Sequence, residues 1–236
     1  MRVDGRLHHE LRLVNITRDF IKYPEGSILI EMGDTKVICN VSIDNVVPPF
    51  LLNENKGWLT AEYSMLPRAT HTRNQRESIK GSLSGRTQEI SRLIGRSLRA
   101  SLDLNKIPGK TILVDCDVIQ ADGGTRVASI TGGYIAVSLA MKKLLEANII
   151  LEDPRIDYVA AVSIGMIDNE IFLDLNYDED YGSFVDLNLV ATASGKIIEI
   201  QGTAEKEPFD HNCLNNMISL GMKGIKTLVE LQKRIV

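Results

Sequence analysis

The sequence predicts a mixed fold of strands and helices, built as one compact domain or as two small halves that share a core. Short runs in which apolar residues alternate with period two indicate half-buried strands, and longer segments with apolar residues at helical spacing indicate helices. No linker rich in Ser, Gly or Pro separates residues 1–150 from residues 151–236. These two halves are therefore expected to pack together as one unit.

The composition is that of an ordinary soluble protein, with 44% apolar and 25% charged residues. No apolar run approaches the roughly 18 residues of a membrane span. The first residues are too charged for a secretory signal, so we expect a cytoplasmic protein that has no membrane partner. The three cysteines form no metal-binding motif, which predicts buried free thiols at Cys39, Cys116 and Cys213.

The first half opens with two strands around a turn at Gly33-Asp34. It continues with a strand, a long polar loop, a helix and a strand (58–66, 67–85, 86–102 and 111–120). Polar loops of that length in a compact domain are usually functional or disordered. A helix over 129–147 follows, and the second half adds four strands and a final helix (158–166, 170–175, 184–192, 196–201 and 211–236).

The charge is unevenly distributed, although the net charge is only −4. Between Arg68 and Arg99 there are eight basic and two acidic residues, so this segment carries +6 and the rest of the chain −10. Such segregation favours a localised site for a polyanion. The candidate residues are Arg68, Arg73 and Arg76 in the loop and Arg92, Arg96 and Arg99 on the next helix. A solvated helix face is the alternative interpretation of the last three.

A glycine turn joins the strand that ends at Gln120 to the following helix. Glycines let backbone N–H groups approach an anion closely, and the start of a helix adds unpaired donors and a favourable dipole. Thr125 supplies a hydroxyl, and Arg126 supplies a planar fork of donors. The stretch could be only a turn, but Thr125-Arg126 and a second Gly-Arg-Thr at 85–87 favour a phosphate site.

Seven acidic residues and no Lys or Arg lie between Asp168 and Asp186. A solvated acidic loop is one interpretation. Near a phosphate site, the carboxylates would instead hold Mg²⁺, or one of them would stay protonated as a general acid. Asp180 and Asp186 lie on either side of a turn into a strand, so their side chains could converge on one point.

Several long motifs resemble the bacterial ribonuclease PH family, in the same order and over essentially the whole chain. They are DGR, GWLTAEYSMLPRATHTRN, GRTQEISRLIGRSLR, DCDVIQADGGTRVASITG and EIQGTAEKEPF. The resemblance implies an α+β fold of two similar β–α halves, related to a ribosomal-protein domain. It also implies a homo-oligomer, assembled as a hexameric ring, that trims tRNA precursors and other structured RNA 3′ ends by phosphorolysis.

The resemblance further implies roles for single residues. Arg86 and the segment formed by Gly124, Thr125 and Arg126 would bind inorganic phosphate. Asp180 and Asp186 match two essential aspartates, which would hold Mg²⁺ or assist protonation of the departing 3′ oxygen. The loop that grips RNA matches Arg68, Arg73 and Arg76. One departure concerns the residues after the first aspartate: the family usually has small residues there, typically Ser-Ala, and this chain has Tyr181-Gly182.

In this interpretation phosphate is itself the nucleophile, which agrees with the lack of an apparent Ser, Cys or His nucleophile in the sequence. Holding two anions in line is mostly a task of positioning and electrostatics. One alternative is an inactive ring subunit, which would lack the arginines or aspartates that this chain retains. The other is a hydrolytic two-metal nuclease, for which we would expect a denser set of carboxylates and histidines and no phosphate seat.

Overall fold

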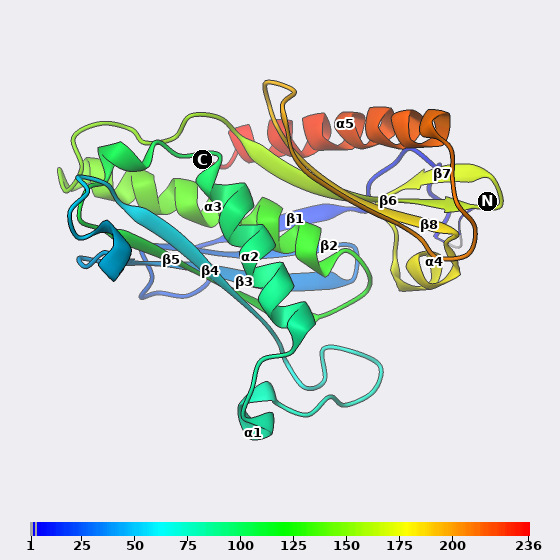
Figure 1. Ribbon diagram of the computed structural model, residues 1–236, viewed down its shortest axis with the longest axis horizontal. Coiled ribbons are helices and arrows are strands. Elements are labelled where there is room, and N and C mark those ends of the chain that lie inside the picture. Colours follow the sequence, from blue (N-terminus) through cyan, green and yellow to red (C-terminus); the bar gives the residue numbers. More distant parts are fainter. Residues whose placement is uncertain (1, 3) are drawn as a thin grey trace.

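The computed structural model describes residue 2 and residues 4–236, arranged in two β-sheets with helices between and over them (Figure 1). The first sheet has the order β1-β2-β3-β5-β4, from Val14–Arg18, Gly26–Met32, Thr35–Asp44, Thr111–Gln120 and Trp58–Met65. Its strands pair antiparallel except β4 and β5, which are parallel. The second sheet is antiparallel with the order β7-β6-β8-β9, from Glu170–Leu173, Val159–Ile167, Val185–Thr192 and Ile197–Ala204.

Three long helices complete the layers: α2 (Gly85–Arg99), α3 (Thr125–Glu146) and α5 (His211–Lys233). The helix α3 packs against the first sheet and also against β6, where the Thr131 hydroxyl donates to the Ala161 carbonyl. It is apolar on all sides and buried along most of its length, as expected for a helix between two sheets. The helix α5 covers the second sheet on the other face of β6. The two elements are in close contact, because a Cβ at Gly221 of α5 would lie 2.9 Å from the Ile164 side chain of β6. One core cluster extends through both halves.

Most of the expected elements are confirmed. Residues 111–120 form β5, with Ile112, Val114, Cys116 and Val118 buried as their alternation predicted. The helix α3 begins at Thr125, four residues before the expected start. The sequence did not predict the edge strand β1 or two short helices, α1 (Glu77–Lys80) and α4 (Tyr177–Gly182). Two 3-10 turns, Pro49–Leu51 and Leu104–Lys106, lie outside these layers.

The cysteines are free, as predicted. Cys39 and Cys116 are distant in sequence but directly opposite each other on β3 and β5, with 3.9 Å between their sulfur atoms. Both are buried, whereas Cys213 is only half-buried, which the sequence did not predict. Within the described residues, the hydropathy and length of the helices do not suit any of them to crossing a membrane.

Candidate active site where the two halves meet

The predicted phosphate turn, residues 122–124, leads from β5 into α3. Gly123 and Gly124 have φ values of 73° and 66°, in the left-handed region that favours glycine. A Cβ on Gly123 would lie 2.6 Å from the Leu175 carbonyl oxygen, so the turn touches the backbone in front of α4. Among the described residues, no side chain caps the start of α3. The first N–H groups of this helix therefore remain available to an anion.

The two side chains that follow the turn have different surroundings. Arg126 is half-buried and donates to Gln201 Oε1 of β9 at 2.8 Å, with Glu89 of α2 3.5 Å away. It is therefore fixed where α2, α3 and β9 meet. The Thr125 hydroxyl is buried and lies 2.8 Å from the Tyr63 hydroxyl. The contribution of this hydroxyl to phosphate binding stays a prediction.

The two predicted aspartates lie close enough for the charge of Asp180 to act on Asp186. Asp180 lies on the exposed side of α4 and Asp186 on β8. Partial burial raises the pKa of both carboxyls, and for Asp186 the neighbouring charge of Asp180 adds to this, so its pKa reaches about 6. The positive charges of Arg86 and Arg126 act on both carboxyls in the opposite direction. Four predicted residues from four elements therefore share one electrostatic field.

The acidic region is not the solvated loop that the sequence also allowed. Asp174 is fully buried in an ion pair with Arg12, whose Nη1 donates to the Asp122 carbonyl of the phosphate turn. Glu179 caps α4 and receives a bidentate pair of hydrogen bonds from Arg2, at 2.7 and 2.6 Å. These two carboxylates hold α4 and the chain in front of it in place.

The arginines outside the phosphate site divide into two groups. Arg68, Arg73 and Arg76 are exposed on the loop, as predicted. On α2, Arg96 forms an ion pair with Glu199, and Arg99 stacks over Trp58 at 4.6 Å and donates to the Leu59 carbonyl. Of the three helix arginines, Arg92 alone forms no ion pair, side-chain hydrogen bond or cation–π contact among the described residues. Arg96 and Arg99 have protein partners, and an RNA-binding role for these two stays a prediction.

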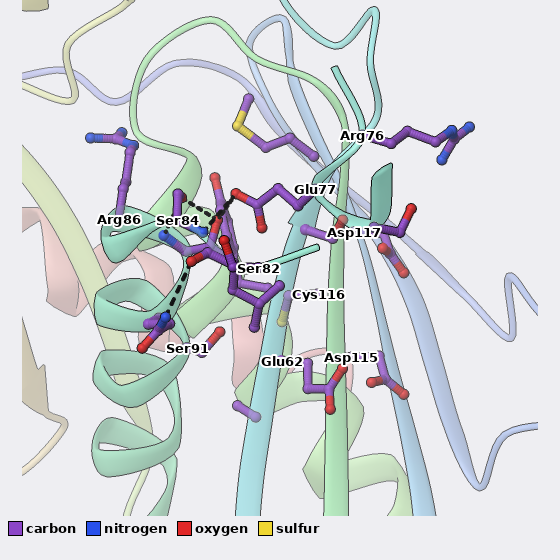
Figure 2. Close-up of a pocket in the computed structure, with 18 of the residues that line it drawn as sticks. Glu62, Arg76, Glu77, Ser82, Ser84, Arg86, Ser91, Asp115, Cys116 and Asp117 are labelled. Carbon is purple, nitrogen blue, oxygen red and sulfur yellow. Dashed lines mark hydrogen bonds between the residues drawn. The ribbon is translucent and has the colours of Figure 1, made fainter. Parts of the chain in front are cut away.

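The polar loop folds back over the start of α2. Glu77 accepts a hydrogen bond from the Thr87 hydroxyl at 2.8 Å and from the Ser84 N–H at 3.3 Å (Figure 2). An open cavity of about 1240 Å³ lies between this loop and the outer face of β4 and β5. Arg86 and Arg92 reach one side of it, and three carboxylates line the sheet side, Glu62, Asp115 and Asp117 (Figure 2). Arg86 thus stands between the cavity and the aspartates.

Four further residues belong to the site and were not assigned by sequence reasoning: Arg12, Asp174, Gln201 and Glu205. The charge of Glu205 raises the pKa of both Asp180 and Asp186. Gln201 and Glu205 lie within the motif EIQGTAEKEPF, so the sequence marked this segment but assigned no role to either residue. Arg12 and Asp174 are 162 positions apart and outside any quoted motif.

Comparison with known proteins identifies the family. The model of the 3′ exoribonuclease family, domain 1, matches residues 10–143, and that of domain 2 matches residues 157–224. Ribonuclease PH of Bacillus velezensis and that of Bacillus subtilis are each 55% identical over 100% of this chain and 97% of theirs. The chain belongs to the ribonuclease PH family. It is a phosphorolytic 3′-to-5′ exoribonuclease of tRNA processing, as the motifs implied.

Solved structures confirm the α+β fold of this ribonuclease PH family member. Rice Rrp46 superposes with a TM-score of 0.79 at 20% identity, over 98% of both chains. A chain of the Archaeoglobus fulgidus exosome with RNA bound to the active site gives 0.80 at 22% identity, over 97% of this chain and 91% of that one. At these identities the likeness concerns the fold alone.

Proposed function

We propose that phosphorolysis takes place where α3, α4 and β8 meet. Inorganic phosphate binds at Arg86 and at the N–H groups and guanidinium of Gly124, Thr125 and Arg126. The observation that carries this proposal is the shared field of two arginines and two aspartates at the uncapped start of α3. Phosphate carries two or more oxygens that accept hydrogen bonds, which suits the planar fork of an arginine and a helix start.

In the reaction, a phosphate oxygen attacks the phosphorus of the last phosphodiester. The bond from that phosphorus to the 3′ oxygen breaks, a nucleoside diphosphate leaves, and the 3′ oxygen takes up a proton. Arg86 and Arg126 offset the repulsion between the two anions, and the N–H groups orient the attacking one. Because a phosphodiester is exchanged for a phosphoanhydride, high concentrations of nucleoside diphosphate drive 3′ extension.

Asp186 is suited to the proton transfer. A pKa of about 6 leaves a useful protonated fraction near neutral pH, and a group whose pKa lies close to the working pH is an efficient acid. Burial also raises the pKa of Asp180, and the positive charge of Arg86 opposes this rise.

The same pair fits Mg²⁺. This ion is commonly held by one or two carboxylates together with substrate phosphates, and the described residues contain no group of three ligands that would form a protein cage. As the alternative to proton transfer by Asp186, both aspartates would be ionised and would hold the ion, which would neutralise charge on the phosphates during the reaction.

RNA is held outside the reacting centre by Arg68, Arg73 and Arg76, with Arg92 beside them. Their exposure leaves them available to a phosphate backbone. We extend the proposal to a hexameric ring, a homo-oligomer in which several such loops face one tRNA precursor or other structured 3′ end.

The test is to incubate a single-stranded RNA with and without inorganic phosphate and to identify the mononucleotide released. Nucleoside diphosphates should appear only when phosphate is present. Asp180→Asn should abolish most activity without rescue by added phosphate, while its thermal transition and oligomeric mass stay those of the wild type. Nucleoside monophosphates released without phosphate would refute the proposal.

A further inference from the structure

Three aromatic side chains gather beside the proposed site, two from α4 and one from the arginine loop. The rings of Tyr177 and Tyr181 are nearly parallel, at an interplanar angle of 20° with 6.4 Å between centroids. The ring of His71 lies 5.3 Å from that of Tyr177. Tyr181 is 84% exposed and Tyr177 45% exposed, so the cluster faces solvent.

The cluster is attached to the reacting residues at both ends. Tyr177 and Tyr181 are four residues apart on α4, hence on one side of the helix, and Asp180 lies between them in the chain. The Tyr177 N–H donates to Asp122 of the phosphate turn at 3.1 Å. His71 comes from the loop between Arg68, whose guanidinium donates to the His71 carbonyl, and Arg73.

Core packing does not account for the ring of Tyr181. A tyrosine that is mostly exposed buries little apolar area, and an exposed hydroxyl needs no protein partner. Aromatic faces interleaved with arginines are instead the usual combination for single-stranded nucleic acid, because every base has a face that can stack and every phosphate can meet a cation. The proposed reaction brings an unpaired RNA 3′ end to Asp180, within the same short helix.

We propose that Tyr177, Tyr181 and His71 form a stacking surface for one unpaired nucleobase of the RNA close to its 3′ end. The inference rests on the proposed function, since it takes the 3′ end to lie at Asp180. Stacking accepts all four bases, so the surface adds affinity for RNA without selecting a sequence. The exposed face of Tyr181 is the part that the base covers.

The test compares Tyr181→Ala, Tyr181→Phe and Tyr23→Ala in phosphorolysis of a short single-stranded RNA. Tyr23 is a matched control, because it is 86% exposed. It also adjoins Pro24, whose carbonyl meets Lys143 at the far end of α3. Loss of one stacked base should raise KM for RNA about tenfold in Tyr181→Ala, while KM for phosphate keeps its wild-type value. Tyr181→Phe should stay within about twofold of the wild type, since the ring remains.

A second arm locates the base. In a series of RNAs, each lacks the base at one of the last few positions. At the position that stacks, base removal should weaken wild-type binding, and Tyr181→Ala should then add no further loss, because two changes to one contact are not additive.

The outcomes separate the two proposals. If wild-type protein releases no nucleoside diphosphate, the proposed function fails. If the wild-type protein releases nucleoside diphosphate and Tyr181→Ala has the wild-type KM for RNA, only the proposed stacking surface is refuted. An equal loss in Tyr181→Phe and Tyr181→Ala would assign the effect to the hydroxyl. A changed oligomeric mass in Tyr181→Ala would assign the surface to contact between copies of the chain. Either result overturns the inference.

Discussion

Arg12 and Asp174 form a buried ion pair, 2.7 Å from Nη2 to Oδ1, that joins the phosphate turn to the chain in front of α4. The second carboxylate oxygen of Asp174 accepts from the backbone N–H of Arg12 at 2.7 Å and from its Nε at 3.1 Å. The remaining donors of Arg12 point to the carbonyls of Asp122 and Gly123. One guanidinium therefore sets the distance between the proposed phosphate seat and the helix that carries Asp180.

Arg12→Met should lower the free energy of unfolding by about 3–5 kcal/mol, because it leaves the buried carboxylate of Asp174 with only Arg6, 3.8 Å away, as a charged partner. Lys106→Met is the control, since it breaks an exposed pair with Glu152, and such pairs contribute about 0–1 kcal/mol. Urea unfolding at pH 7 measures both. Equal losses in the two variants would show that the Arg12–Asp174 pair is no more important than a surface contact.

Arg126→Ala should lower turnover roughly 10²–10³-fold, by analogy with removal of a preorganised donor from an oxyanion site. RNA binding should change little, because the loop arginines are separate from this residue. Arg96→Ala is the control, as Arg96 is an exposed arginine paired with Glu199 outside the proposed seat. Steady-state phosphorolysis over a range of phosphate concentrations is the measurement. Wild-type turnover of Arg126→Ala at limiting phosphate would contradict the assignment.

Asp186→Asn should inactivate the protein and yet stabilise it by about 1–2 kcal/mol at pH 7, a range reduced for partial exposure. The folded-state pKa of about 6 lies above the ordinary 3.8, so between these values the folded state binds more protons than the unfolded state. Stability contributed by this group therefore falls as pH rises through that window and stays lower above it.

The gain in Asp186→Asn should accordingly be present at pH 7 and nearly absent at about pH 4, below the window. Asp178→Asn, on the same acidic segment but exposed, is the control and should change stability at neither pH. Urea unfolding at the two pH values gives both differences. A loss of stability at pH 7, or a gain of the same size at both pH values, would show that Asp186 is not desolvated in the folded state.

Sequence reasoning succeeded where a feature is local. The alternation of β5, the glycine turn and the apolar length of α3 lie within one continuous stretch, and together they predicted a strand, a turn and a helix in this order, although α3 begins at Thr125 and so includes Arg126. It failed where a role depends on a partner far along the chain. The sequence around Arg99 does not indicate that its guanidinium stacks over Trp58. The sequence around Thr125 likewise does not indicate a hydrogen bond with the Tyr63 hydroxyl.

The short helix α4 shows the same limit. Its six residues have no apolar stripe, so no periodicity marks them, and a capping box with ion pairs to the N-terminal segment holds the helix in place. The acidic composition was visible in the sequence. Only the folded structure distinguishes the carboxylates that hold α4 in place from those that face the arginines.

The loop residues Arg68, Arg73 and Arg76 should bind the RNA away from its 3′ end and take no part in the reaction. In a triple Ala variant, the slope of log affinity against log salt should fall by about 0.7 for each lost contact with single-stranded RNA. Structured tRNA precursors should lose more affinity than short oligonucleotides, which reach only the proposed pocket. Lys106→Ala is the control, because Lys106 pairs with Glu152 outside the loop and α2, which predicts an unchanged slope. Binding measured against salt, beside phosphorolysis of a short oligonucleotide, gives both readouts. An unchanged slope on tRNA, or equal losses of affinity for the long and short substrates, would show that these arginines have no RNA-binding role separate from the reaction.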